Sequence, residues 1–118
     1  MSIRTTRPIS WISSARKVFT GFPRGAQEII LSALTIAAEG GKADIAKPMK
    51  GLGSGIFEVA LPYGGNAFRV VYTVQIGDEI WVIHAFQKKS ATGIKTQKHE
   101  IDLVKDRLKR LKEMLNER

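Results

Sequence analysis

The chain has 118 residues, no cysteine and a net charge of +8, from 19 lysines and arginines against 11 acidic residues. This size predicts a single domain, 1–118, and the lack of cysteine excludes disulfides, thiolate catalysis and cysteine-based zinc sites. We also expect no metal, no cofactor, no membrane span and no secretory signal, and hence a cytoplasmic protein. The positive charge favours a polyanionic partner such as nucleic acid, or an acidic protein that masks it.

The first forty residues predict a short strand followed by two helices. Residues 1–7 are polar and expected to be flexible. Apolar and polar residues alternate over 9–12 behind a proline, which suits an edge strand. Ser13 or Ser14 can cap a short helix that ends at about Phe19, and a proline can open a second helix over 23–39 that ends at two glycines. The wide apolar stripe of the second helix predicts that it is buried against a sheet.

The next thirty residues predict a loop and a strand. Segment 42–55 contains three closely spaced glycines without the spacing of a Walker loop, so we expect a connector from which Lys47 and Lys50 reach across a neighbouring groove. Apolar residues then alternate over 55–62, as in a half-buried strand. Glu58 would share a face with Arg69 of the following strand, as its ion-pair partner or, less favoured, as a general acid or base.

Two runs rich in β-branched and aromatic residues flank Gly77-Asp78, which predicts a hairpin with a two-residue turn. Such a turn fixes the register of the strands. On one face it pairs Ile76 with Glu79, Val74 with Trp81, Tyr72 with Ile83, and Val70 with Ala85. On the other face it pairs Gln75 with Ile80, Thr73 with Val82, Val71 with His84, and Arg69 with Phe86, and this face continues to Lys88.

The second face of the hairpin mixes cationic and aromatic side chains, whereas the first is almost wholly apolar. Single-stranded nucleic acid is often held by such a mixture, through phosphate pairing and base stacking. An ordinary half-exposed sheet with scattered polar residues is an equally good interpretation.

The end of the chain is strongly basic: residues 88–112 hold nine basic residues against three acidic ones. Thr96 is predicted to cap a helix over 97–116, whose far end can dock a partner chain. The element order strand–helix–helix–strand–strand–strand–helix places the chain in the α+β class, with helices packed on a small antiparallel sheet. The last helix has a narrow apolar seam of Ile101, Val104, Leu108, Leu111 and Leu115.

Four motifs stand out: Lys-Pro-Met-Lys-Gly-Leu-Gly-Ser-Gly from Lys47, Phe-Arg-Val-Val-Tyr-Thr from Phe68, Ile-His-Ala-Phe-Gln-Lys-Lys-Ser from Ile83, and Gly-Ile-Lys-Thr from Gly93. Together they make the chain resemble the phage-related RelE/HigB-type toxins of bacterial type II toxin–antitoxin modules. The resemblance implies a RelE-like fold and a ribosome-dependent endoribonuclease that cuts mRNA in the A site of the 30S subunit without a metal. It also implies a cognate antitoxin, often a helix-turn-helix protein.

The resemblance also assigns roles to individual residues. Arg69 would bind the phosphate in the transition state, His84 would transfer a proton, and Lys88 and Lys89 would bind or activate the phosphate. A structural role for His84 carries nearly equal weight. Binding and positioning of RNA would fall to Lys47, Lys50, Phe86, Lys95 and Lys98, although packing is the stronger expectation for Phe86.

Two other functions are compatible with this sequence. One is a ParE-like inhibitor that binds DNA gyrase and cuts nothing, and the other is a non-catalytic nucleic-acid-binding protein of phage origin. The expected cluster of Arg69, His84 and Lys88 favours the endoribonuclease, because a gyrase inhibitor has no need of it.

Overall fold

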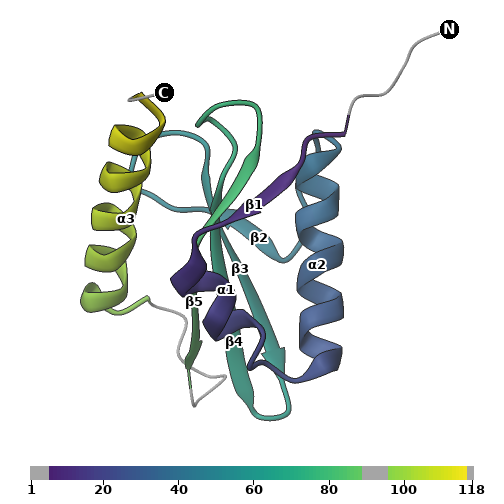
Figure 1. The fold of residues 1–118 in the computed structure, drawn as a ribbon. Coiled ribbons are helices and arrows are strands. Elements are labelled where there is room, and N and C mark those ends of the chain that lie inside the picture. Colours follow the sequence, from purple (N-terminus) through teal and green to yellow (C-terminus); the bar gives the residue numbers. More distant parts are fainter. Residues whose placement is uncertain (1–5, 89–95, 117–118) are drawn as a thin grey trace, which may run out of the picture.

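The computed structural model describes residues 6–88 and 96–116, and it confirms the α+β class (Figure 1). In chain order the elements are β1 (Ile9–Trp11), α1 (Ser13–Phe19), α2 (Arg24–Ala38), β2 (Ala46–Pro48), β3 (Ile56–Tyr63), β4 (Asn66–Thr73), β5 (Ile80–Lys88) and α3 (Lys98–Asn116). α2 and α3 begin and end within one residue of their predicted bounds. α1 ends at Phe19 as predicted, but its N-cap is Ile12 and not a serine.

The described strands form one five-stranded sheet in the order β1-β5-β4-β3-β2, with α2 and α3 on opposite sides of it (Figure 1). Two expectations about this sheet were wrong. β1 runs parallel to β5, so the sheet is mixed and not wholly antiparallel. The segment predicted as a loop contains β2, which pairs with β3 and sets Lys47 opposite Glu58. Three residues ending in a proline are too short to show a strand's alternation.

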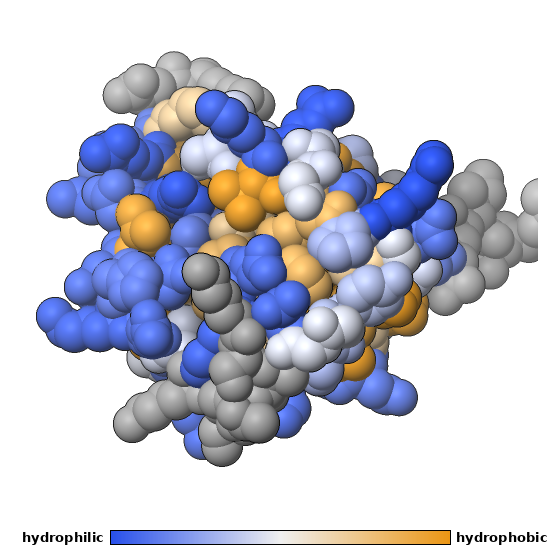
Figure 2. Space-filling view, turned by 90° about the horizontal axis from the view of Figure 1, so that it is seen from below, coloured by the Kyte–Doolittle hydropathy of each residue, from blue (hydrophilic) through white to orange (hydrophobic). Residues whose placement is uncertain are grey.

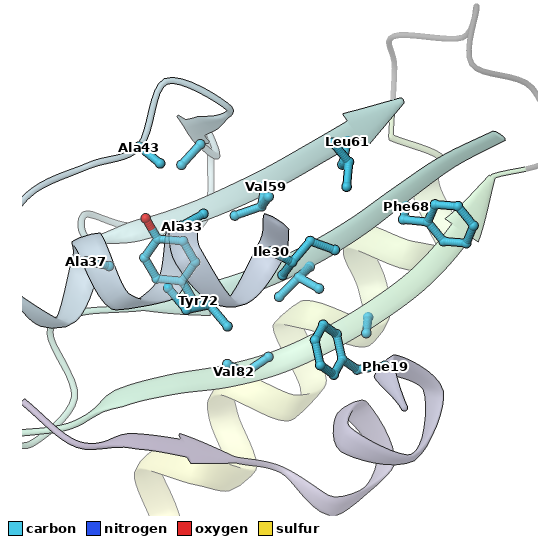
Figure 3. Close-up of a cluster of buried hydrophobic side chains, with 14 of the residues drawn as sticks. Phe19, Ile30, Ala33, Ala37, Ala43, Val59, Leu61, Phe68, Tyr72 and Val82 are labelled. Carbon is cyan, nitrogen blue, oxygen red and sulfur yellow. The ribbon is translucent and has the colours of Figure 1, made fainter. Parts of the chain in front are cut away.

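The larger core lies between the sheet and α2 (Figure 3). Ile30 and Ala33 of α2 pack over the central strands, and Phe19 and Phe68 close the end of the cluster. Fully burying a side chain such as Ile30 stabilises the fold by about 1.5–3 kcal/mol. The Tyr72 hydroxyl is also buried here, and desolvation raises the pKa of Tyr72 to about 12.

A smaller core lies between α3 and the other face of the sheet, which we call the α3 face. Val104, Leu108 and Leu111 of the predicted seam are buried there against Val71 and Ile83. Both faces of the sheet are therefore covered by a helix over much of their area. The expected division into one apolar and one open cationic face does not hold.

The hairpin register was predicted correctly at its open end and wrongly near its turn. Arg69 pairs with Phe86 and Val71 with His84, as expected. A β-bulge then leaves Ile83 as an extra residue, so that Tyr72 pairs with Val82 instead. A bulge reverses which face the following side chains occupy. Thus Trp81 and Ile83 pack under α3, and Ile80 and Val82 join the α2 core.

The turn of the hairpin is also wider than predicted, because residues 74–79 lie outside the strands. The guanidinium of Arg7 fills this turn and donates to the carbonyls of Val74 at 2.8 Å, Glu79 at 3.0 Å and Asp78 at 3.1 Å. The backbone of Arg7 also donates to Ala38. Arg7 is therefore anchored, contrary to the expected flexibility of residues 1–7; residues 1–5 lie outside the described part.

Candidate active site

The α3 face brings two of the predicted catalytic residues together. Arg69 on β4 and His84 on β5 occupy alternate positions of the paired strands, so both side chains lie on this face. Each residue is only 4% exposed, however. The predicted open hollow is instead a buried polar network, which residues of α3 and of the segment just before it complete.

Arg69 is held by Glu58 and Thr96. Its Nη1 lies 3.1 Å from Glu58 Oε1 and 3.0 Å from Thr96 Oγ1, and that hydroxyl donates to Glu58 Oε2 at 2.8 Å. The predicted ion pair between Glu58 and Arg69 is therefore present. The predicted cap is not: α3 starts at Lys98, and the Thr96 hydroxyl contacts this pair instead.

His84 lies between Glu100 and Arg107, both from α3. Arg107 Nη1 is 2.7 Å from His84 Nδ1 and also donates to the carbonyl of Ile83 at 3.2 Å. A guanidinium can only donate, so Nδ1 must be the acceptor and the ring proton must sit on Nε2. That N–H donates to Glu100 Oε1 at 3.0 Å. His84 is thus a neutral imidazole with both nitrogens engaged.

The surroundings of His84 also set its protonation. Burial lowers the pKa of His84 below its ordinary value of 6.5, and the charge of Arg107 lowers it further. The hydrogen bond to Glu100 acts in the opposite direction and is the smaller effect. Desolvation likewise lowers the pKa of Arg107. Phe86 stacks on His84, with ring centroids 5.1 Å apart, and is buried, which agrees with the expected packing role.

The predicted lysines among the described residues lie nearer the surface than Arg69 and His84. Lys88 is half-buried at the end of β5, on the same side of the strand as His84 and Phe86. Lys47 and Lys50 are exposed on and just after β2, and Lys98 is exposed beside Asp102. Lys89 and Lys95 fall outside the described residues. Seen from below, hydrophilic side chains dominate the side of the molecule formed by α3 (Figure 2).

Within residues 6–88 and 96–116, no group of three or more histidines, aspartates and glutamates is arranged to hold a metal ion. The helices of this same part include none that is long and apolar enough to cross a membrane.

The arrangement has a chemical consequence for each candidate. Arg69 could receive an anion only after a group that now contacts its guanidinium, such as Thr96, had moved aside. Both nitrogens of His84 are used. It could transfer a proton only after Glu100 or Arg107 had moved. In the described geometry, Lys88 is therefore the most accessible of the described catalytic candidates.

Sequence reasoning missed Glu100 and Arg107 as members of the network. They lie seven residues apart, which places them on one flank of the helix beside the apolar seam. This spacing was a usable signal. It could not be matched to His84 from the sequence, because only the docking of α3 on the sheet brings Glu100 and Arg107 over that residue.

We expect His84 to make the fold less stable in mild acid. Because the pKa of His84 is lower in the folded than in the unfolded chain, the unfolded chain binds more protons below about pH 6.5. The free energy of unfolding is therefore lower below about pH 6.5 than above it. Urea unfolding of the wild type at pH 7.5 and 5.5 should show this loss, and His84→Gln should reduce the difference between the two pH values. The same difference in His84→Gln as in the wild type would mean that His84 does not cause this pH dependence.

Comparison with known proteins adds a family and a fold. Residues 17–109 match the model of the family described as phage-derived protein Gp49-like (DUF891). The structure is similar to the crystal structure of the isolated E. coli RelE toxin (P21 form), with a TM-score of 0.56 and 17% identity over 85% of this chain and 97% of that one. Among curated proteins, no sequence is significantly similar. The chain therefore belongs to the phage-derived Gp49-like family, and its fold is that of a RelE-type toxin.

Proposed function

We propose that this protein is the toxin of a type II toxin–antitoxin module and that it cuts mRNA in the A site of the ribosome. The family and the fold support a toxin of RelE type. The observation that carries the nuclease assignment is the register of β4 and β5, which gathers Arg69, His84 and Lys88 on one face. The net charge of +8 suits a protein that works among RNA phosphates.

The proposed reaction is the attack of a ribose 2′-hydroxyl on the adjacent phosphorus. The new bond joins the 2′-oxygen to phosphorus, and the bond from phosphorus to the 5′-oxygen breaks. A base takes the proton of the 2′-hydroxyl, and an acid returns one to the leaving 5′-oxygen. The products are a 2′,3′-cyclic phosphate and a 5′-hydroxyl. No metal is required if cations stabilise the charge on the phosphate oxygens.

In this proposal Lys88 and Lys89 bind the scissile phosphate, and Arg69 stabilises the transition state once Thr96 has moved. His84 transfers a proton only in a state where α3 has released it. Lys47, Lys50, Lys95 and Lys98 position the RNA. The active toxin binds the ribosome in the cytoplasm. A cognate antitoxin, expected to be a helix-turn-helix protein, binds and inhibits the toxin.

One observation favours the second candidate function, a ParE-like inhibitor of DNA gyrase. Arg69 and His84 are both buried and hydrogen-bonded within the protein, as residues with a structural role would be. A gyrase inhibitor would need neither side chain for chemistry. The two functions therefore predict different results: an endoribonuclease cuts RNA and needs a cation such as Lys88 to do so, whereas a gyrase inhibitor cuts no RNA.

Inducing this protein alone should arrest growth and create new mRNA 5′ ends inside translated frames, detected by primer extension. Lys88→Ala should reduce these ends about 100-fold, since it removes one cation from the phosphate. Lys17→Ala, at an exposed lysine of α1, removes the same charge elsewhere and should keep wild-type cleavage. Unchanged transcripts together with a loss of supercoiling activity would instead support the gyrase inhibitor.

A further inference from the structure

A groove lined by lysines runs along α3, away from the candidate active site at the start of that helix. It encloses about 350 Å³ between α3 and the glycine-rich segment after β2, with Gly51, Leu52, Lys105, Leu108, Lys109 and Lys112 around it. We call it the lysine groove. We propose that the lysine groove binds the sugar–phosphate backbone of single-stranded RNA, as a second contact of the toxin with its RNA target.

The spacing of the lysines is the first support. Lys105, Lys109 and Lys112 follow one another at four and three residues, so they project from one flank of the helix. Like charges at this spacing repel and weaken a helix. The three lysines destabilise the helix that carries them, so a contribution to folding does not explain them. Binding of an anionic ligand that neutralises their charge does.

Asp102, Asp106 and Glu113 of α3 are the acidic residues nearest in sequence, and none of them comes within 4.0 Å of a groove lysine. Asp102 lies 3.6 Å from Lys98, and Asp106 lies 3.2 Å from Arg110. Within residues 6–88 and 96–116, no carboxylate comes within 4.0 Å of the three groove lysines. Their ammonium groups therefore face solvent as a block of positive charge.

The wall opposite the lysines consists of Gly51 and the half-buried Leu52. Gly51 has a φ of +83°, and a Cβ on it would meet nothing within 4 Å. A phosphate could therefore approach this wall closely. Lys112 also lines an adjoining hollow of about 170 Å³, which extends past Ser54 to Gln75. A further hollow beside Lys112 is lined by Asp78 and Glu79, so the phosphate path ends there.

The same features argue against an acidic protein segment as the occupant. Protein interfaces have apolar centres in which lysine is depleted. Of the two apolar residues of the lysine groove, Leu108 is only 5% exposed, and Leu52 is half-buried against the same smaller core. The exposed surface is therefore mostly cationic, which suits a chain of phosphates.

The test is equilibrium binding of a fluorescent 2′-O-methyl RNA oligonucleotide, which cannot be cut. Lys105→Gln/Lys109→Gln/Lys112→Gln should weaken binding at least tenfold and lower the slope of log affinity against log salt by about 2, from three lost phosphate contacts. Arg16→Gln/Lys17→Gln/Arg24→Gln removes the same charge from exposed residues of α1 and α2 and should change affinity less than twofold.

If the two triple variants lose equal RNA affinity, the proposed binding in the lysine groove is wrong, because RNA affinity would then depend on net charge alone. Unchanged RNA affinity together with lost binding of a polyglutamate peptide would overturn it in favour of an acidic protein partner. The inference rests on the proposed function in one respect, namely that RNA rather than another polyanion is taken as the ligand. Because the probe cannot be cleaved, its result is independent of whether Lys88 supports cleavage.

Discussion

Glu58→Ala is expected to lower the free energy of unfolding by about 3–5 kcal/mol. The substitution leaves the guanidinium of Arg69 buried without the carboxylate that faces it at 3.1 Å, and it removes the acceptor of the Thr96 hydroxyl. Removing the carboxylate that faces a buried charge is among the largest effects that one substitution can have. Urea unfolding followed by tryptophan fluorescence measures the change.

The control for this substitution is Glu113→Ala, which removes a carboxylate from the exposed side of α3. Exposed charges contribute about 0–1 kcal/mol, so this variant should unfold close to wild type. A loss below about 1 kcal/mol in Glu58→Ala would mean that water reaches Arg69 and that the pair is not part of the buried network.

Local pattern sufficed for the helices because their period and end signals lie within a few residues of one another. The seam of α3 predicted Val104, Leu108 and Leu111 as buried, and they are. The open end of the hairpin was also predictable, since alternation fixes which residues share a face. β2 escaped notice because its pairing with β3 depends on residues about ten positions away in sequence.

The candidate site was harder to predict because it depends on how α3 docks. Sequence placed Arg69 and His84 on one face, yet nothing local could show that Glu100 and Arg107 would cover His84. The bulge at Ile83 changed which side chains face α3. A wider turn, filled by the guanidinium of Arg7, is present in place of the expected two-residue turn. The contacts of α3 with His84 and of Arg7 with the turn join residues far apart in the chain, where periodicity carries no information.

The double variant Glu58→Gln/Arg69→Met should fold and yet cut RNA about 10²–10³-fold more slowly. Replacing both members of a buried ion pair removes the unpaired charge, so stability should stay within about 1–2 kcal/mol of wild type. The glutamine introduced in place of Glu58 still accepts from Thr96 through its amide oxygen, whereas methionine fills much of the space of Arg69 without its donors. Losing a donor that stabilises transition-state charge has the stated effect on rate.

This variant separates the two roles of Arg69, which Arg69→Ala cannot do, because that change leaves Glu58 unpaired beneath Thr96. Primer extension on mRNA from cells expressing the double variant reports cleavage, and urea unfolding of the purified protein reports folding. A stable protein that cuts at the wild-type rate would make Arg69 a structural residue. The transition-state charge would then fall to the lysines at the end of β5, where Lys88→Ala measures their contribution.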